Sequence, residues 1–228
     1  MTSAKGKGKT ADGVRDPLRA LDSAAAAYAP ALPPIAFEMV AGNDYVQARI
    51  DGAAVRLSFC GTNDPQDWKS NLRAELIPFK GIGHVHKGFA EAWTKFEDGL
   101  RKRLKCLSGS PVFIEGHSRG GSIGTIAAAI LGNYWEEFGQ VEALTTFGAP
   151  MVGDKYFVEM VEKACRSISR YEVETLPLPG FRDPVPRVPP FPKYRPAGKR
   201  IRLFAVGKPS DLHAVGTYRK ALVRRASK

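Results

Sequence analysis

The sequence predicts an α/β fold in which helices flank a central, mostly parallel sheet. Two observations carry this prediction. Short apolar runs alternate with helical patterns along the second half of the chain, and strands separated by helices pair in parallel through right-handed crossovers. A Gly-x-Ser-x-Gly pentapeptide at 116–120 also stands between an apolar run and a helix of small residues. That is the context of a tight strand-to-helix turn.

The first half of the chain predicts a helix, a strand meander and a second helix. Apolar residues recur at three- and four-residue spacing after Phe89, which is typical of an amphipathic helix. Gly42-Asn43-Asp44 is a hairpin turn signal. We expect, in order, a short helix from Pro17, strands over 35–42 and 45–52, a third strand over 53–60, a loop-rich stretch over 61–86 and a helix over 89–107.

The second half of the chain predicts the parallel part of the sheet. Buried strands appear as compact apolar runs, and prolines mark one long loop before the last strand. We expect, in order, a strand over 111–115, a helix over 122–131, a strand over 143–147, a helix over 154–164, a strand over 168–173, a Pro-rich loop over 176–196, a strand over 200–206 and a terminal helix from about His213.

The net charge of +11 is concentrated at the two ends of the chain. Eleven Lys and Arg residues lie between 193 and 228, where Asp211 is the only acidic residue. We expect residues 1–16 to form a flexible basic arm, because they mix Gly and Lys without apolar periodicity, and residues 17–228 to form a single domain. The basic ends suggest peripheral contact with an anionic membrane surface.

Several classes of protein are disfavoured by composition. No run approaches the roughly 18 apolar residues of a spanning helix, and the first residues lack the apolar core of a signal peptide. We therefore expect a cytoplasmic location, with non-classical export as the alternative. Cys60, Cys106 and Cys165 have neither disulfide-framework nor metal-ligand spacing, so we expect no metal and no cofactor. No nucleic-acid signature accompanies the charge, and no feature specifies an oligomeric state.

Ser118, at the centre of the pentapeptide, is the candidate nucleophile. The glycines two residues away on either side allow the neighbouring backbone to pass without a Cβ clash, while the serine projects from a strained turn. A serine hydroxyl needs a base to take its proton and an acid to orient that base. His213 is the only histidine after Ser118, so it is the candidate base. Asp183, in a proline-stiffened loop, is the favoured acid, and Asp211 is the rival.

Five ordered sequence blocks and a late His213 and Tyr218 resemble one family, the class 3 lipases, which include secreted fungal triacylglycerol lipases. The blocks are FCGTNDPQDWKSNL (59–72), HKGFAEAW (86–93), VFIEGHSRGG (112–121), TFGAPMVGD (146–154) and DPVPRVPP (183–190). The resemblance implies an α/β-hydrolase fold with a short lid segment. It also implies roles for Ser118 as nucleophile, Asp183 as orienting acid and His213 as base.

The resemblance further implies an oxyanion hole formed by Thr62 and by the backbone N–H of Arg119. Two residues depart from the family pattern. Cys60 stands where an arginine is usual, so contacts of that arginine must be absent or supplied elsewhere, with Arg49 and Arg56 as candidates. Arg119 replaces the usual leucine, which places a cation beside the predicted acyl site.

The lid segment that the resemblance implies is small and charged. Its large apolar groups, Trp68 and Leu72, form an i, i+4 pair that could close over the pocket, although Trp68 could equally pack in the body of the protein. A lid of this kind predicts only modest activation at lipid interfaces.

Three functions from different classes follow from these observations. The favoured one is a serine carboxylic-ester hydrolase, a lipase or esterase that cleaves acyl esters of lipids through an acyl-enzyme. The second is a phospholipase of the same mechanism that acts on anionic membrane lipids. The third is a non-catalytic binding module on a hydrolase scaffold, which the retention of Ser118, Asp183 and His213 disfavours.

Overall fold

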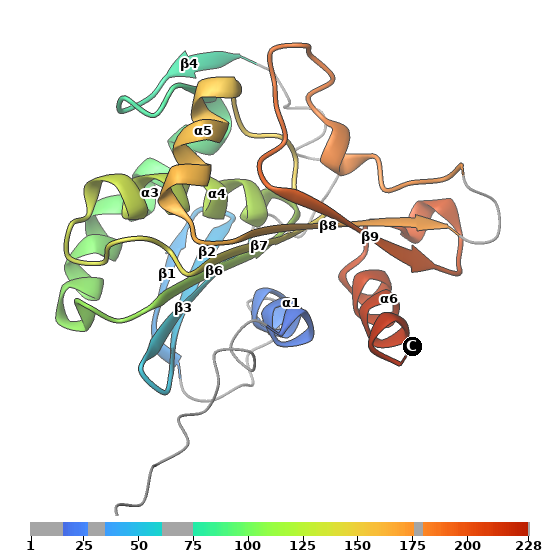
Figure 1. Ribbon diagram of the computed structural model, residues 1–228, viewed down its shortest axis with the longest axis horizontal. Coiled ribbons are helices and arrows are strands. Elements are labelled where there is room, and N and C mark those ends of the chain that lie inside the picture. The colour runs from blue at the N-terminus through green and yellow to red at the C-terminus, as the bar shows by residue number, and fades with distance from the viewer. Residues whose placement is uncertain (1–15, 27–34, 61–74, 176–179, 228) are drawn as a thin grey trace, which may run out of the picture.

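The computed structural model describes residues 16–26, 35–60, 75–175 and 180–227, and a seven-stranded sheet forms its centre (Figure 1). The strand order is β1-β2-β3-β6-β7-β8-β9. The strands are β1 (Ile35–Ala41), β2 (Asp44–Asp51), β3 (Ala54–Cys60), β6 (Val112–His117), β7 (Ala143–Phe147), β8 (Ile168–Thr175) and β9 (Lys199–Ala205).

The sheet is mostly parallel, as the sequence predicts. The hairpin strands β1 and β2 pair antiparallel with each other, and β2 pairs antiparallel with β3. From β3 onward each neighbouring pair is parallel. Helical connections account for most of this switch from antiparallel to parallel pairing. A parallel strand pair needs a long crossover, whereas an antiparallel pair needs only a tight turn.

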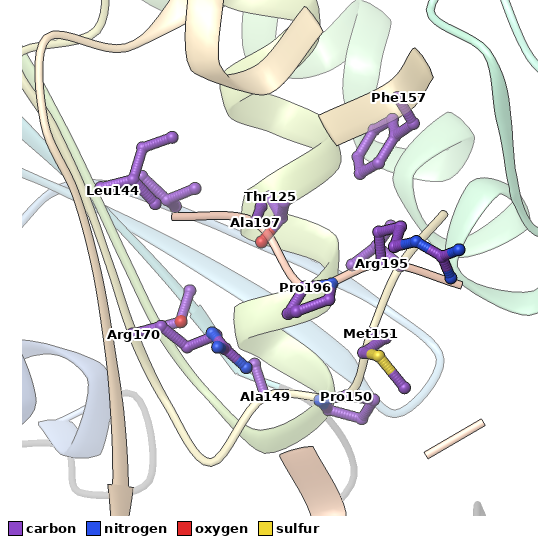
Figure 2. Close-up of a pocket in the computed structure, with 13 residues that line it drawn as sticks. Thr125, Leu144, Ala149, Pro150, Met151, Phe157, Arg170, Arg195, Pro196 and Ala197 are labelled. Atoms are coloured by element: carbon purple, nitrogen blue, oxygen red, sulfur yellow. The ribbon is translucent and has the colours of Figure 1, made fainter. Parts of the chain in front are cut away.

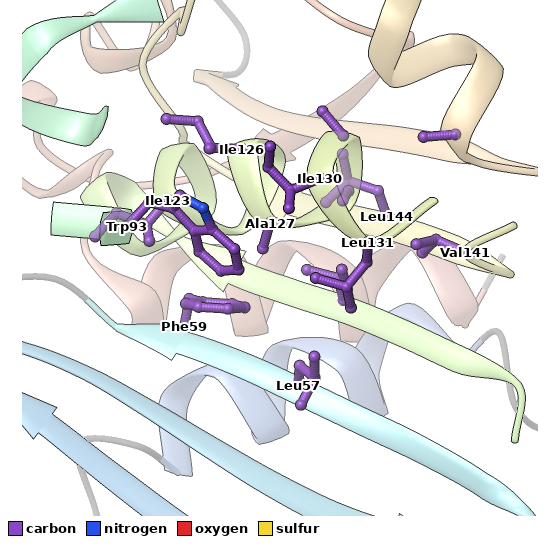
Figure 3. Close-up of a cluster of buried hydrophobic side chains, with 14 of the residues drawn as sticks. Leu57, Phe59, Trp93, Ile123, Ile126, Ala127, Ile130, Leu131, Val141 and Leu144 are labelled. Atoms are coloured by element: carbon purple, nitrogen blue, oxygen red, sulfur yellow. The ribbon is translucent and has the colours of Figure 1, made fainter. Parts of the chain in front are cut away.

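Helices cover both faces of the sheet (Figure 1). On one face lie α3 (Lys87–Leu104), α4 (Ser118–Tyr134) and α5 (Lys155–Ala164), and on the other lie α1 (Pro17–Ala26) and α6 (Val215–Ala226). The larger core fills the space between the sheet and α3–α5. There Trp93 packs on Phe59 with ring centroids 6.4 Å apart, beneath the apolar side chains of α4 (Figure 3).

The loop-rich stretch predicted over 61–86 is wrong at its end. The chain forms a small antiparallel hairpin of β4 (Leu76–Pro78) and β5 (His84–His86), closed through Lys80 and Gly81, both with positive φ. Strands of three residues are too short to show an alternating pattern, so the sequence gives no strand signal there. The predicted arm over 1–16 lies almost wholly outside the described residues, as do Thr62, Trp68 and Leu72.

The parallel register brings distant segments of the chain to one edge of the sheet. Phe59 pairs with Gly116, so β3 and β6 end side by side. Asp183 follows β8, and His213 follows β9, the strand paired with β8. The carboxyl ends of parallel strands are where α/β folds place their sites. Among the described helices, none is both long and apolar enough to cross a membrane.

Candidate active site

Ser118 occupies a strained turn between β6 and α4. Its φ is +54°, a left-handed conformation that costs a non-glycine residue about 1–3 kcal/mol. The flanking glycines are sterically required. A Cβ at Gly116 would come within 2.6 Å of the Gly121 backbone, and one at Gly120 within 2.1 Å of the Phe59 carbonyl oxygen. The serine therefore projects from a turn that is held tightly against the end of β3.

The structure brings Ser118, His213 and Asp183 into one hydrogen-bonded chain. The His213 Nε2 atom lies 2.8 Å from the Ser118 hydroxyl oxygen, and His213 Nδ1 lies 2.8 Å from an Asp183 carboxylate oxygen. His213 lies 95 positions from Ser118 and 30 positions from Asp183 in sequence, so only the tertiary fold makes these residues neighbours. In this geometry the imidazole can take the hydroxyl proton while the carboxylate fixes its tautomer.

Asp183 is fully buried and held by donors on both oxygens. The Tyr218 hydroxyl donates to one oxygen at 2.6 Å, and the Val185 backbone N–H donates to the other at 3.0 Å. Burial by itself raises the pKa of Asp183, but the hydrogen bonds and charge of His213, together with the donors Tyr218 and Val185, bring it below the usual value. The carboxylate therefore stays ionised beside the imidazole.

His117, the residue before the serine, packs on the ring of His213. The two rings are stacked with centroids 4.8 Å apart, and His117 Nε2 lies 2.9 Å from the His213 carbonyl oxygen. Burial lowers the pKa of His117 to about 3, with a smaller contribution from the charge of His213. His117 is therefore neutral at physiological pH and donates this hydrogen bond.

Arg119 does not present an unpaired cation to the site. Its guanidinium makes two hydrogen bonds to Asp44, at 2.8 and 3.0 Å, and lies 5.6 Å over the ring of Phe89. Asp44, at the start of β2, thus pairs the charge that the sequence places beside the acyl site. The Arg119 backbone N–H lies in the first turn of α4 and has no acceptor within the helix. This N–H is free to face an oxyanion.

Thr62, the predicted second donor of the oxyanion hole, lies outside the described residues. The strand that leads to it ends at Cys60, directly beside the turn that carries Ser118. Cys60 donates its thiol to the Ala24 carbonyl oxygen at 3.1 Å. Arg56, one of the two arginines proposed to substitute for the family arginine, forms a buried ion pair with Glu115 across β3 and β6. Arg49 donates to Gln47 at 2.7 Å.

The rival acid Asp211 lies outside the hydrogen-bonded chain of Ser118, His213 and Asp183. Asp211, the rival acid, accepts a hydrogen bond from Ser210, and its carbonyl oxygen accepts one from Thr217. It therefore shapes the turn before α6. The contacts of His117 with His213 and of Asp44 with Arg119 carry no sequence signal, because each joins residues at least 75 positions apart. Within the described ranges, no three His, Cys, Asp or Glu residues form a group that could hold a metal ion.

A serine on a strand-to-helix turn, hydrogen-bonded to a histidine and a buried aspartate at the carboxyl edge of the sheet, defines a serine hydrolase scaffold of the α/β-hydrolase class. Residues 56–193 match the model of the Lipase (class 3) family, and the chain belongs to that family. The fold agrees. A triacylglyceride lipase from Rhizomucor miehei superposes with a TM-score of 0.69 at 19% identity, over 85% of this chain and 81% of that one.

Two curated relatives are similar to parts of the chain. A secreted mono- and diacylglycerol lipase from Fusarium solani is 34% identical over 143 residues, which cover 59% of this chain and 39% of that protein. A chloroplastic phospholipase A(1) from Arabidopsis thaliana is 29% identical over 145 residues, which cover 54% of this chain and 32% of that protein. The matched region thus spans less than half the length of either relative.

Proposed function

We propose that the protein hydrolyses carboxylic esters of lipids through an acyl-enzyme on Ser118. The observation that carries the proposal is the hydrogen-bonded chain from Ser118 through His213 to Asp183, with both links at 2.8 Å. His213 takes the hydroxyl proton as Ser118 attacks the ester carbonyl, and returns it to the leaving alcohol. Water, activated by the same histidine, then attacks the acyl-enzyme and releases the acid.

The oxyanion formed at each attack needs preorganised donors. The Arg119 backbone N–H meets this need from the first turn of α4, and Thr62 is our proposal for the second donor. Removing one such donor typically costs about 2.7–4 kcal/mol of transition-state stabilisation. Because the Arg119 guanidinium is bound to Asp44, the side chain of this residue has a structural role while its backbone N–H serves as the oxyanion donor.

Acylglycerols are the substrates that we favour, and phospholipids are the second candidate. The Fusarium solani relative is a mono- and diacylglycerol lipase, and the Arabidopsis thaliana relative is a phospholipase A(1). A series of substrates from short p-nitrophenyl esters to triolein and phosphatidylcholine separates these candidates. Acylglycerol hydrolysis faster than phospholipid hydrolysis supports the first, and the reverse order supports the second.

Trp68 and Leu72 remain our proposal for the apolar face of a short lid. A small lid predicts that activity rises only modestly when the substrate aggregates. Hydrolysis rates measured across the aggregation point of one ester check this proposal. A steep rise confined to aggregated substrate would contradict it.

The change Ser118→Ala tests the mechanism directly. It should lower kcat for p-nitrophenyl butyrate by at least about 10³-fold, because removal of a triad nucleophile typically costs more than that. The unfolding midpoint should change little, since alanine keeps the same Cβ in the turn and the change removes only the hydrogen bond to His213. Hydrolysis by the variant at the wild-type rate would overturn the role of Ser118, and absence of hydrolysis by the wild-type protein would favour a binding module.

A further inference from the structure

A basic pocket of about 400 Å³, which Ser118 does not line, lies where the β4–β5 hairpin, the start of α5 and the turn over 191–195 meet. Three cations line it, and they are accompanied by a histidine, a carboxylate and a tyrosine. We define the basic pocket by these residues: Lys155, Lys193, Arg195, His84, Asp154 and Tyr156.

The walls of the basic pocket are joined by backbone contacts. The Arg195 N–H donates to the Gly153 carbonyl oxygen at 2.9 Å, and the Asp154 N–H donates to the His84 carbonyl oxygen at 3.0 Å. A Cβ at position 153 would come within 2.5 Å of that same His84 oxygen, so the close approach requires glycine. The three segments are therefore fixed relative to one another.

The single carboxylate of the pocket is already engaged. Asp154 accepts hydrogen bonds from the His84 ring at 2.9 Å and from the Phe157 backbone N–H at 2.8 Å, which caps α5. Lys155 is 84% exposed and approaches only Glu159, at 3.7 Å, among the described acidic residues. No acidic partner of Lys193 occurs among the described residues. The pocket thus presents an excess of positive charge.

Arg195 is held so that its charge faces the basic pocket. Its guanidinium donates to the Pro192 carbonyl oxygen and, at 2.8 Å, to that of Tyr194. Figure 2 shows the guanidinium pointing away from Arg170 and from the narrow cavity that they both line. That cavity, of about 20 Å³, has room for little more than one water molecule, so it is not a candidate ligand site.

Two exposed aromatic side chains accompany the cations. Tyr156 is 53% exposed, and Phe191 is 51% exposed. Phe191 belongs to the turn that carries Lys193, since its carbonyl oxygen accepts from the Tyr194 N–H at 3.0 Å. Aromatic rings beside lysine and arginine are typical of surfaces that bind the headgroup region of a lipid bilayer.

We propose that the basic pocket binds the phosphate of an anionic phospholipid and holds the protein on an anionic lipid surface. The pocket adjoins the active-site loop along the chain, since the turn at Lys193 continues the loop that carries Asp183. Docking there would hold the ester-hydrolase domain at the lipid surface. The inference that docking serves ester hydrolysis rests on the proposed function, whereas the inference that the basic pocket binds anionic phospholipid does not.

The cations of the C-terminal segment are a weaker candidate for this contact, because several of them are paired within the protein. Arg219 forms an ion pair with Asp22 at 2.9 Å, and Arg200 forms one with Glu172 at 2.8 Å. The remaining cations there supply a matched control. Lys208, Lys220 and Arg224 are exposed and have no ion-pair partner among the described residues.

Vesicle flotation tests the proposal in the Ser118→Ala background, where no lipid is consumed. The combined change Lys155→Gln, Lys193→Gln and Arg195→Gln should lower partitioning onto equal mixtures of phosphatidylcholine and phosphatidylglycerol by about 100-fold at low salt, since each cation contributes about fivefold. The combined change Lys208→Gln, Lys220→Gln and Arg224→Gln should lower it far less. Equal losses in both proteins, or no loss in the first, would overturn the proposal.

Two further measurements separate this proposal from the hydrolase proposal. With Ser118 restored, the pocket variant should hydrolyse p-nitrophenyl butyrate at the wild-type rate. If no form of the protein hydrolyses that ester, the hydrolase proposal fails while the vesicle result stands. The single change Lys193→Gln, at an exposed position, should lower partitioning about fivefold and guards against misfolding of the triple variant.

A second, independent observation concerns His117. His213 lies between a short 3-10 helix, η4 (Pro209–Asp211), and α6, outside regular secondary structure. His117 contacts it twice, by ring stacking at 4.8 Å and by the 2.9 Å hydrogen bond to its carbonyl oxygen. The Tyr218 ring also packs against the ring of His117 in a T-shaped arrangement, with the ring centroids 5.7 Å apart. We infer that His117 is a positioning residue that sets both the backbone and the ring plane of His213.

Two variants separate the contacts. The change His117→Phe keeps a ring for stacking and loses the hydrogen bond, whereas His117→Asn keeps a donor and loses the ring. Each should lower kcat by about 10–100-fold with KM little changed, because a small misplacement of a catalytic group slows the chemical step. A variant that is less stable but keeps the wild-type kcat would overturn this inference and leave His117 a packing residue.

Discussion

The hydroxyl of Tyr218 donates a 2.6 Å hydrogen bond to Asp183 inside the protein, where neither side chain contacts solvent. A buried carboxylate is costly unless donors surround it, and Tyr218, Val185 and His213 supply them. Burial and the nearby charge of Asp183 raise the pKa of Tyr218 well above 10, so the phenol keeps its proton and remains a donor. Tyr218 therefore supports the acid that orients His213.

The change Tyr218→Phe should destabilise the fold by about 1.5–3 kcal/mol, the usual contribution of a hydrogen bond to a charged group. It should also lower kcat, because Asp183 loses a fixed partner. Tyr194→Phe is the matched control, since the Tyr194 hydroxyl is buried and has no hydrogen-bond partner among the described residues. Urea unfolding should show little loss, or a gain, for the control. Equal losses would mean that the Asp183 contact contributes nothing.

The lowered pKa of Asp183 also predicts a pH dependence of stability. A carboxyl whose folded pKa lies below its unfolded value, about 3.9, stabilises the fold fully above that value. This contribution is lost as the pH falls through the folded pKa. In Tyr218→Phe the folded pKa should rise, so the difference in stability between wild type and variant should shrink at acid pH. Urea unfolding from neutral to acid pH checks this, and a constant difference would contradict it.

At the scale of elements, the packing of α4 against the sheet decides whether the Ser118 turn forms. Gly120 lies against the Phe59 carbonyl oxygen, and Gly124 lies near Ile114 of β6, where a Cβ would be 3.2 Å from that side chain. Farther along α4, a Cβ at Gly132 would be 2.4 Å from the Ala164 carbonyl oxygen at the end of α5. Small residues thus allow α4 to lie close to its neighbours on two sides.

The change Gly120→Ala should destabilise the protein and lower esterase activity, because the new methyl group would displace β3 from the turn. Overpacking of this kind typically costs about 1–3 kcal/mol. Gly216→Ala in α6 is the control, since a Cβ there meets no atom within 4 Å and alanine favours helix. Thermal unfolding and p-nitrophenyl butyrate hydrolysis check both variants. Wild-type behaviour of Gly120→Ala would show that the turn tolerates a wider spacing.

At the scale of the whole molecule, part of the positive charge is balanced inside the fold. Glu172 and Glu174 of β8 are buried, and arginines from several segments surround them. Glu172 meets Arg170 at 2.6 Å and Arg200 at 2.8 Å, and Glu174 meets Arg182, Arg200 and Arg202 at 3.4–3.6 Å. These arginines form a structural cluster, so the net charge of +11 overstates the charge free to attract a partner.

The change Glu172→Gln should therefore destabilise the fold, since it leaves Arg170 and Arg200 facing each other without their shared carboxylate. We expect a loss of about 1–3 kcal/mol, less than for a fully buried pair because Arg200 is partly exposed. Added salt should recover part of it. Glu159→Gln, which removes an exposed ion pair with Lys155, should change little. Urea unfolding at low and high salt compares the two, and equal effects would contradict the cluster.

Local sequence patterns were sufficient to predict most helices and strands and the Ser118 turn. Each depends on short-range properties, such as apolar periodicity or glycine spacing, that neighbouring residues express by themselves. The β4–β5 hairpin was missed, because strands of three residues, one of them bridged through Val85 to Gly153, have no periodicity of their own. The stacking of His117 on His213 was missed for a related reason, since the two residues meet only through the end of the sheet.

The candidate residues and their order along the chain follow from the amino-acid sequence alone, because a nucleophile turn and its single later histidine are local and countable features. The tertiary structure decided which carboxylate faces His213, since Asp183 and Asp211 differ in where the ends of β8 and β9 place them and not in chemistry. It also decided which cations lie in buried ion pairs and which stay exposed. Arg119 and Arg200 find buried acids across the sheet, whereas Lys155 and Lys193 remain at the surface, and only folding brings such distant charges together.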